Sequence, residues 1–335
     1  MSGAALSSPD LSAPDLSIPD LSIIVVSYNT RQMTLACLES VLAETREKSF
    51  ELIVVDNASP DGSAEALASR FPPAGAPGHD PRVRLILEAE NHGFARANNL
   101  AAREARGKRL LLLNPDTVVL DRALDRLAAF ADRVPQARIW GGRTRFADGS
   151  LNPSSCWRRQ TLWTTFCRTA GLTGLLPNSA IFNAEAYGGW ARDSEREVDI
   201  VVGCLLLIDR DLWQALEGFD PSYVMYGEEA DLCLRARSFG ARPRLTPEAT
   251  IIHHGGASET VRADRVVRIL KGKATLIHRH AAPGAREAMI FLYKLWPLTR
   301  VWAARALGGL GGRKRESAEV WAEVWKRRGE WAGGY

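Results

Sequence analysis

Polar residues suited to binding a ligand stand where short apolar runs of the sequence end. They form four groups: Ser27-Tyr28-Asn29, Asp56-Asn57, Asn91 and Asn114-Pro115-Asp116. Loops are polar in most proteins, so any single group would carry little weight. If the apolar runs are parallel strands of one sheet, their carboxyl ends meet at one edge, where open α/β sheets bind ligands. The four groups together therefore predict a binding site at that edge.

Residues 21–135 alternate between two kinds of segment. Short apolar runs typical of buried parallel strands cover 21–27, 50–56, 83–87 and 110–113. Segments that favour helices cover 30–43, 64–71, 91–106 and 121–133. Asn91 is expected to cap the third helix and Gly107 to end it. The alternation predicts a parallel sheet with helices on both faces.

The residues that follow are less regular. Residues 151–198 contain several Gly and Trp with weak periodicity, which is typical of a loop-rich insertion. The patterns then predict a buried strand at 198–208, short helices at 209–216 and 228–239, and one or two strands at 244–252. His253-His254-Gly255-Gly256 comes directly after them.

The length and composition are those of a globular protein. Of the 335 residues, 46% are hydrophobic and 24% are charged, close to the globular average. These values exclude wholesale disorder, a collagen-like sequence and a multi-span membrane protein. Residues 8–22 repeat a five-residue unit that contains Pro, so residues 1–20 are expected to form a disordered leader.

The net charge of +4 is unevenly spread, because residues 260–335 hold 16 Lys or Arg and 6 Asp or Glu. This asymmetry predicts a basic end that meets an anionic partner, and it does not favour a nucleic-acid binder. The five cysteines form no CxxC pair, and Cys37, Cys204 and Cys233 are expected to be buried free thiols. With no visible signal peptide, the expected compartment is the reduced cytosol.

Seven motifs follow one another between residues 22 and 256: SIIVVSYNT (22–30), IVVDNASPDGS (53–63), NHGFARANNLA (91–101), LLLLNPDT (110–117), VVGCLLLIDR (201–210), GFDPSYVMYGEEADLCLRAR (218–237) and HHGG (253–256). This ordered set resembles the family 2 glycosyltransferases of GT-A fold, and its pattern is most similar to bacterial rhamnosyltransferases of cell-surface polysaccharide synthesis. The resemblance implies an α/β fold with a mostly parallel central sheet flanked by helices. The catalytic domain would cover 21–258, with a nucleotide-binding half to about 135 and an acceptor half from 136. A basic, Trp-rich helical extension would cover 259–335.

The resemblance assigns the strand-end residues to a nucleotide-sugar donor. It implies that Asp56 reads the nucleobase, and a carboxylate there is a fit acceptor for a pyrimidine N3–H. The alternative interpretation of Asp56 is the start of an Asx-turn. Gly93 allows close backbone approach at a helix N-terminus, which favours anions. The implied donor-binding residues are Ser27, Tyr28, Asn29, Asp56, Asn57, Asn91, Gly93, Phe94, Asn98, Asn114 and Asp116.

The resemblance also implies a divalent metal, Mg²⁺ or Mn²⁺, beside the diphosphate. The family's DxD-like triplet reads Asn114-Pro115-Asp116 here, so Asp116 is its one charged ligand. A second ligand matches His253 or His254. Oxygen ligands and water would complete the coordination. The alternative interpretations are a plain turn at the triplet and an ordinary strand-end histidine.

A general base is implied by the acidic pair Glu228-Glu229 at the start of a helix. The second position is usually Asp in the family, so this chain departs from the pattern. Neighbouring residues of a helix point about 100° apart, so the two carboxylates are expected to have different roles. Glu229 matches the position of the base, and Glu228 remains the competing assignment. Gly203, Cys204 and Asp231 would lie on the acceptor side, although Asp231 could simply pair with Arg235.

The implied activity is an inverting, metal-dependent transfer of a sugar to a saccharide or a lipid-linked acceptor. The first donor to consider is dTDP-L-rhamnose, and UDP- and GDP-sugars are the others. A catalytically inactive sugar-nucleotide-binding or scaffold protein is the main alternative, kept open by Asn114 and Glu229. A sugar-1-phosphate nucleotidylyltransferase would need a Gly-rich basic loop after the first strand. A dehydrogenase would need GxGxxG there, and the chain has Ser27-Tyr28-Asn29-Thr30 instead.

The C-terminal end combines Trp with Lys and Arg. Its apolar run Met289–Trp296 is broken by Lys294 and followed by Pro297, so it is too short to span a membrane. Five of the ten Trp lie between 296 and 331, which predicts helices in a membrane interface. The alternative is a pair of helices packed on the catalytic domain. The expected location is cytoplasmic, peripheral on the inner membrane face. The oligomeric state stays open.

Overall fold

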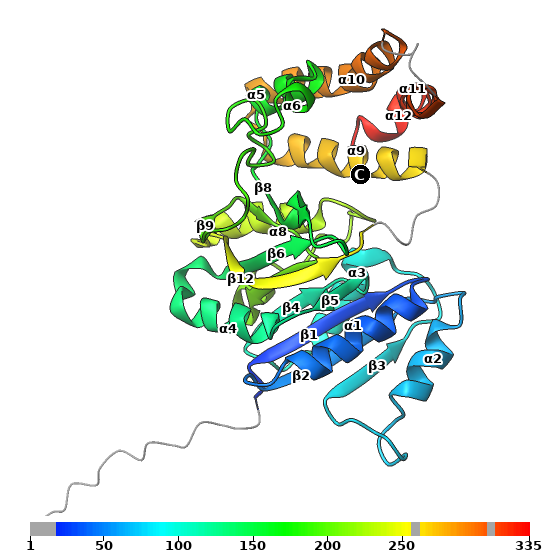
Figure 1. The fold of residues 1–335 in the computed structure, drawn as a ribbon, viewed down its shortest axis with the longest axis vertical. Helices are drawn as coiled ribbons and strands as arrows, with labels where there is room; N and C mark the ends of the chain where they lie inside the picture. The colour runs from blue at the N-terminus through cyan, green and yellow to red at the C-terminus, as the bar shows by residue number, and fades with distance from the viewer. Residues whose placement is uncertain (1–17, 256–261, 307–311) are drawn as a thin grey trace, which may run out of the picture.

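The computed structural model describes residues 18–255, 262–306 and 312–335 (Figure 1). Most of the predicted leader, at 1–17, lies outside the described residues, as does Gly256. The predicted boundary near 258 also falls in an undescribed segment. The central feature is a ten-stranded sheet with the order β3-β2-β1-β4-β11-β6-β12-β5, in which β7 pairs with β6 and β9 with β12.

The amino-terminal half of the sheet is parallel, as predicted. It consists of β1 (Leu21–Ser27), β2 (Phe50–Asp56), β3 (Val83–Leu87) and β4 (Arg109–Leu113). Every residue of β1 and β2 is buried, because helices cover both faces of these strands. The register places Ser27 opposite Asp56, so both strands end at the same level. The predicted strand ends are therefore brought together.

Alternate residues of β1 enter two different cores. Ile23 and Val25 pack with α1, α2 and α4, whereas Ile24 and Val26 pack with α3, α7 and α8. This division confirms the predicted helices on both faces of the sheet. The helices are α1 (Arg31–Glu44), α2 (Ser63–Arg70), α3 (Gly93–Glu104), α4 (Ala123–Arg133), α7 (Arg210–Ala215) and α8 (Glu228–Ala236).

Both predicted boundary signals of α3 have other roles. Asn91 is not the N-cap, since its side-chain oxygen accepts the Gly93 N–H at 2.8 Å in a turn that precedes the helix. The helix ends at Glu104, before Gly107. A Cβ on Gly107 would lie 2.5 Å from the Ser22 nitrogen. Glycine is needed at 107 because the chain passes directly against β1.

The second half of the sheet is mixed, and one predicted strand is wrong. The run 198–208 breaks at 202–204: β10 (Ile200–Val201) pairs with β8 (Cys156–Trp157) in a small separate sheet, and β11 (Leu205–Asp209) runs antiparallel to β4. The break has a consequence for the site, because it leaves Gly203 and Cys204 in a turn. The other strands are β5 (Thr117–Val119), β6 (Ile139–Arg145), β7 (Leu151–Asn152), β9 (Arg196–Glu197) and β12 (Arg244–His253).

The segment 151–198 is rich in loops, as predicted, but it also contains two short helices. These are α5 (Leu162–Thr169) and α6 (Leu172–Leu175). A reciprocal capping box between Thr161 and Thr164 begins α5. A capping box usually has Ser or Thr at the N-cap and Glu or Gln three residues later. Here the later residue is Thr164, so the sequence pattern did not reveal the start of α5.

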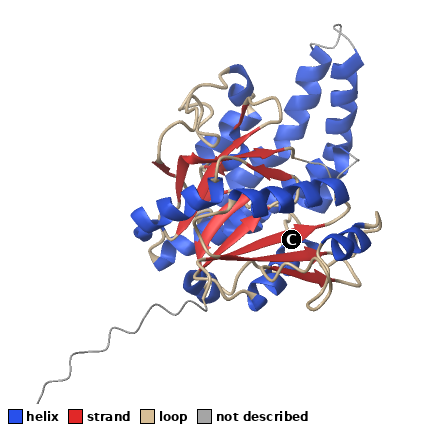
Figure 2. Ribbon diagram, turned by 60° about the horizontal axis from the view of Figure 1, so that its bottom comes forward, coloured by secondary structure: helices blue, strands red, loops and turns tan. Residues whose placement is uncertain are grey.

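Four helices form the C-terminal end: α9 (Arg262–His280), α10 (Pro283–Ala306), α11 (Gly312–Lys326) and α12 (Arg328–Trp331). They lie with α5 and α6 at the end of the molecule away from β1–β3 (Figures 1 and 2). Among the described residues, no helix is long and apolar enough to cross a membrane. Trp296 and Trp331 are buried in the core that these helices share. The side chains of these two Trp are therefore withdrawn from any membrane interface, and the predicted interfacial helices remain a prediction.

A buried carboxylate joins the C-terminal helices to the loop-rich segment. Glu185 accepts hydrogen bonds from Arg168 of α5 at 2.8 Å and from Lys273 of α9 at 2.7 Å. Burial would raise the pKa of Glu185, but the two cations outweigh burial and hold it at about 2. The Glu185 carboxylate is nearly closed to water, whereas the side chains of Arg168 and Lys273 keep 17% and 25% of their exposure.

Replacing Glu185 tests this junction. Glu185→Gln leaves two cations without their carboxylate, so unfolding at pH 7 should become easier by about 3–5 kcal/mol. Because folding depresses the pKa of Glu185, its contribution is present above the ordinary value of 4.5 and is lost as pH falls towards 2. Urea unfolding should therefore show wild type and variant converging below pH 4. The control Glu104→Gln removes an exposed partner of Arg84 and should change stability little.

Candidate active site

Asp56 ends β2 with one carboxylate oxygen satisfied and one not. Its Oδ2 accepts the Ser59 N–H at 3.0 Å, so the turn interpretation holds. Its Oδ1 is buried and has no hydrogen-bond partner among the described residues. An unpaired buried acceptor costs free energy, and a ligand donor would recover it. Both interpretations of Asp56 are therefore compatible with the geometry.

Asn57 and Asn91 shape the turn that leads into α3. The Asn57 Nδ2 donates to the Asn91 Oδ1 at 2.9 Å, and the Asn57 Oδ1 accepts the His92 N–H at 3.0 Å. Gly93 follows with a φ of 77°, which glycine adopts without strain. These bonds fix the start of α3 beside the end of β2, where its first N–H groups face the same edge of the sheet.

The remaining predicted donor residues differ in how accessible they are. Tyr28 and Asn29 are exposed at the end of β1. The hydroxyl of Ser27 is buried and bonds a threonine of α1 at 2.8 Å. Asn98 is also buried, and its amide donates to a carbonyl one turn earlier in α3. The side chains of Ser27 and Asn98 thus stabilise the fold, and their predicted donor contacts remain predictions.

Asp116 and His253 meet at the junction of β5 and β12. The His253 Nε2 lies 3.4 Å from the Asp116 Oδ1 and 3.5 Å from the Asn114 Nδ2. The antiparallel pairing of His253 with Thr117 fixes this approach. The His254 side chain is exposed instead, and its backbone N–H donates to the Asp116 carbonyl. Of the two histidines, the structure brings His253 to Asp116.

The electrostatics of this pair favour opposite charges. Burial would raise the pKa of Asp116, but the contact with His253 outweighs it and lowers that pKa. Burial would lower the pKa of His253, but Cys204 and Asp116 outweigh it and raise the value to about 10. The two side chains are mostly buried, with exposed fractions near one tenth. A carboxylate and an imidazole thus converge in a partly desolvated place.

These residues suit a divalent cation that has only two protein ligands. No group of three or more His, Cys, Asp or Glu able to hold a metal occurs in the part of the chain that the structure describes. Asp116 supplies an oxygen ligand, which Mg²⁺ and Mn²⁺ both prefer, and His253 supplies a ring nitrogen, which suits Mn²⁺ better than the harder Mg²⁺. The other positions would be taken by a bound diphosphate and water. The donor set therefore fits the implied metal.

The two carboxyl groups at the start of α8 are withdrawn from water and have few polar partners among the described residues. Glu228 is 4% exposed and its Oε2 has no partner among the described residues, whereas Glu229 is half-buried. Burial raises the pKa of both carboxyls, and the neighbouring charge of Glu229 raises that of Glu228 further. Buried acids with raised pKa values are typical of catalytic sites, because they accept protons readily at neutral pH.

Gly203 is the point where the donor side and the acidic pair come together. A Cβ on Gly203 would lie 3.7 Å from the Phe94 ring of α3 and 3.8 Å from the Glu229 Cβ of α8. The next residue, Cys204, accepts the Asn114 N–H through its carbonyl. The turn at 202–204 therefore lies between the two halves of the predicted site and touches both.

Asp231 lies away from this meeting point. It is 1% exposed and bonds Arg235 at 2.6 Å and His280 at 2.8 Å. The ion-pair interpretation is confirmed. The predicted place of Asp231 on the acceptor side remains a prediction.

Helix α9 supports the acidic pair, which the sequence analysis did not anticipate. A Cβ on Gly272 would lie 2.0 Å from the Tyr226 carbonyl, so α9 packs directly on the backbone that precedes Glu228. Arg279 bonds Asp220 at 2.6 Å in the same loop. These partners are about fifty residues apart in sequence, and no local pattern could have revealed them.

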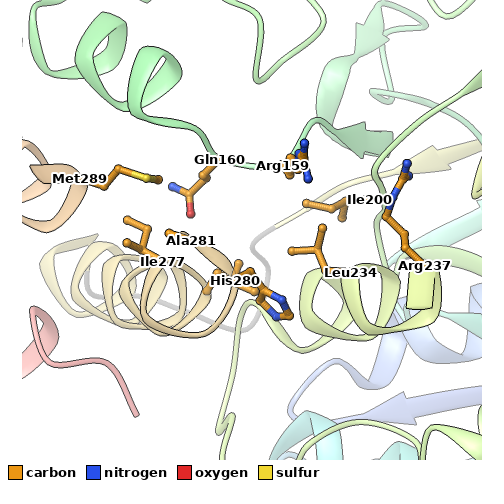
Figure 3. Close-up of a pocket in the computed structure, with 10 residues that line it drawn as sticks. Arg159, Gln160, Ile200, Leu234, Arg237, Ile277, His280, Ala281 and Met289 are labelled. Carbon is orange, nitrogen blue, oxygen red and sulfur yellow. The ribbon is translucent and has the colours of Figure 1, made fainter. Parts of the chain in front are cut away.

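A cavity of about 210 Å³ separates α8 from α9 beyond these contacts (Figure 3). In Figure 3, Leu234 and Arg237 lie together at the right of the cavity. Ile277 and His280 of α9 lie below it, and Arg159 lies above it. None of its lining residues belongs to the predicted site. His280 lines this cavity and also bonds Asp231 of α8 at 2.8 Å.

The raised pKa of Glu228 predicts a pH-dependent gain in stability for Glu228→Gln. As pH rises above about 4.5, the unfolded chain ionises this carboxyl before the folded chain does, so wild-type stability falls. The variant avoids that cost. Chemical unfolding at pH 5 and pH 8 should show it gaining ~1 kcal/mol or more relative to wild type between those values. An unchanged difference between the two pH values would contradict the unpaired burial of Glu228.

Comparison with known proteins places this site in a family. The model of glycosyl transferase family 2 matches residues 22–194. The O-antigen biosynthesis protein RfbC of Myxococcus xanthus is 29% identical over 252 residues, which are 72% of this chain and 18% of that protein. An N-acetylglucosaminyl-diphospho-decaprenol L-rhamnosyltransferase of Mycobacterium tuberculosis is 27% identical over 69% of this chain and 75% of its own length.

A solved structure supports the fold. The mannosyltransferase PcManGT from Pyrobaculum calidifontis, in complex with GDP-Man and Mn²⁺, aligns with a TM-score of 0.57 and 17% identity. The alignment covers 94% of this chain and 88% of the other. The chain spans 18% and 24% of the lengths of two curated relatives, RfbC and an uncharacterised protein of Sinorhizobium fredii. The family model covers more than half of the chain and includes the ends of β1, β2 and β4, so the chain belongs to glycosyl transferase family 2.

Proposed function

We propose that the chain transfers a sugar from a nucleotide-diphosphate donor to a saccharide or lipid-linked acceptor in cell-surface polysaccharide synthesis. The observation that carries the proposal is the meeting at Gly203 of Phe94 and Glu229. This contact brings the carboxyl ends of the parallel strands, where the donor is expected to bind, next to Glu229, whose pKa is raised by burial. Membership of the family supports the same activity.

The first donor to test is dTDP-L-rhamnose. The support is the similarity to a protein named as an L-rhamnosyltransferase, at 27% identity. The free Oδ1 of Asp56 would accept the N3–H of a thymine or uracil base, so UDP-sugars are the next candidates. A GDP-sugar presents a purine edge with a different pattern of donors, and it ranks third.

Glu229 would act as the general base. The acceptor hydroxyl loses its proton to the Glu229 carboxylate while its oxygen bonds to the anomeric carbon of the sugar. The bond from that carbon to the diphosphate oxygen breaks on the opposite face, and the configuration inverts. Glu229 is half-buried at the turn that contacts both sides, whereas Glu228 is nearly inaccessible. Burial raises the pKa of Glu229, and the charge of Glu229 in turn raises the pKa of Glu228.

Asp116 and His253 would hold Mg²⁺ or Mn²⁺, with Asn114 beside them. A bound cation supplies compensation for the negative charge of the departing diphosphate. The protein's own part is to keep an oxygen and a nitrogen ligand close together in a partly desolvated place. His253 then has to give up its proton when the metal binds, which releases that proton to solvent.

A cytoplasmic location at the inner membrane face is part of this proposal. The supporting features are the basic charge of residues 260–335 and the acceptor named for the mycobacterial relative, a diphospho-decaprenol. A non-catalytic sugar-nucleotide-binding protein is the second candidate, because Asn114 stands where the family triplet begins with Asp.

Turnover of nucleotide-sugars tests the activity and its base. A screen of dTDP-, UDP- and GDP-sugars should find one donor from which the wild type releases nucleoside diphosphate. Glu229→Gln should reduce kcat by ~10²–10⁴ and leave donor affinity nearly unchanged. If Glu228→Gln causes the larger loss of kcat, the two roles are exchanged. Donor binding without turnover in any assay would favour the second candidate.

Metal removal tests the role of Asp116. Turnover should stop in EDTA and return with Mn²⁺ or Mg²⁺. Asp116→Ala should lose several kcal/mol of charge stabilisation, about 10²-fold or more in kcat, and should bind Mn²⁺ weakly by calorimetry. Asp80→Ala, which removes the partner of Arg82 in a loop, is the control for loss of an acidic side chain. Full wild-type activity in EDTA would refute the metal site.

A further inference from the structure

Helix α5 has its polar and apolar faces reversed. Its large apolar side chains Leu162, Trp163 and Phe166 are 43–46% exposed. Its threonines point inwards, since Thr164, Thr165 and Thr169 are buried. A surface helix normally buries its apolar face and exposes its polar one. The outer face of α5 is therefore built for surroundings other than water.

Neighbouring segments extend this apolar surface. Leu175 of α6 is 75% exposed, and Ile181 after it is 63% exposed. The Trp163 ring stacks on Phe166 at 5.8 Å and contacts Phe182 at 6.1 Å. Six of the fifteen large apolar residues that are exposed in the described chain lie within residues 162–181. A contiguous group of exposed apolar side chains of this kind is typical of an interaction site on a protein surface.

Helix α10 adds a stripe in which aromatic and basic residues alternate. Phe291 and Trp302 are 62% and 63% exposed, and Lys294 and Arg305 are exposed as well. Their spacing of 3, 8 and 3 residues keeps all four on one side of a helix. The opposite side is buried against the C-terminal core through Met289, Tyr293 and Trp296, among others.

Helices α5 and α10 pack against each other. The Thr169 hydroxyl donates to the Leu292 carbonyl at 2.9 Å, and the Thr299 hydroxyl donates to the Thr169 carbonyl at 2.8 Å. Figures 1 and 2 place α5, α6 and α10 at the same end of the molecule. We call the exposed apolar residues of these three helices, and of the segment that follows α6, the end surface. It comprises Leu162, Trp163, Phe166, Leu175, Leu176, Ile181, Phe291 and Trp302.

We propose that the end surface docks on an anionic lipid bilayer. Basic residues accompany the apolar ones: Lys294 and Arg305 stand on the exposed side of α10 with Phe291 and Trp302, and residues 260–335 carry a local charge of +10. Aromatic and basic side chains on one face are typical of helices that lie in the membrane interface. A second copy of the chain fits less well, because a twofold contact would bring the basic residues of α10 together.

This surface differs from the five Trp that the sequence suggested. Trp296 and Trp331 are buried, whereas α5 and α6 come from the loop-rich segment in the middle of the chain. The inference deepens the proposed membrane location and rests on that part of the proposed function. It does not depend on the transfer reaction, so vesicle binding and turnover can fail separately.

Vesicle flotation with the full chain tests the docking surface. Wild type should float with phosphatidylcholine vesicles that contain 30% phosphatidylglycerol, and much less with pure phosphatidylcholine. The variant Trp163→Ser with Phe166→Ser and Phe291→Ser should weaken binding about tenfold or more. A second variant, Lys294→Gln with Arg305→Gln, should weaken mainly the part of the binding that salt abolishes.

Matched controls separate docking from general stickiness. Leu87→Ser with Phe239→Ser removes two side chains of similar exposure, 50% and 49%, from other places and should bind vesicles like wild type. Glu229→Gln should also bind like wild type, although it loses turnover. Circular dichroism should show each variant folded.

The docking model has clear contrary results. Equal flotation of wild type and both docking variants would overturn it, and so would equal binding to neutral and anionic vesicles. Light scattering that shows a dimer lost in the Trp163→Ser, Phe166→Ser, Phe291→Ser variant, with no vesicle binding by wild type, would assign the surface to a second copy of the chain instead.

Discussion

The central constraint on this structure is a pair of neighbouring carboxyls that lose water and, within the part of the chain that the structure describes, gain no cation. Glu228 and Glu229 are withdrawn from solvent at the start of α8, and burial raises the pKa of each. This arrangement opposes folding, since a buried acid without a partner is costly. The surrounding structure must therefore hold the pair in place. It does so with the contact of Gly272 on the Tyr226 carbonyl and with the bonds of Arg279 and His280.

These contacts tie the C-terminal helices to the segment that carries the acidic pair. Helix α9 contacts the loop before the acidic pair, and Lys273 of the same helix reaches the buried Glu185. Glu185 in turn holds Arg168 of α5. A chain of contacts thus runs from the segment before the acidic pair through α9 to α5, although the family model ends at residue 194.

The sheet performs a second task, which is to align groups that come from distant parts of the sequence. The parallel register sets Ser27 level with Asp56, and the antiparallel return of β11 along β4 places the turn at Gly203 beside Asn114. A continuous strand over 198–208 would have carried Gly203 past this edge. Breaking that strand is what lets one turn touch both Phe94 and Glu229.

Local pattern was sufficient for the strands and helices of the amino-terminal half of the fold. The strands at 21–27, 50–56 and 83–87 were predicted with their observed bounds, because buried parallel strands read as short uninterrupted apolar runs. The order of the motifs identified the family for the same reason, since each motif is a contiguous strand end or helix start. The five cysteines are free and buried, which agrees with the expectation for Cys37, Cys204 and Cys233.

Tertiary structure alone decided the features that depend on contacts between distant segments. Gly107 looks like a helix stop in sequence, but it is needed where the chain crosses β1. His253 and His254 are equivalent in a pattern, and only the pairing of β12 with β5 turns His253 towards Asp116. The C-terminal Trp are alike in composition, yet packing buries Trp331 and leaves Trp302 exposed. Sequence records the polarity of each residue, whereas its neighbours and its exposure follow from how the elements pack.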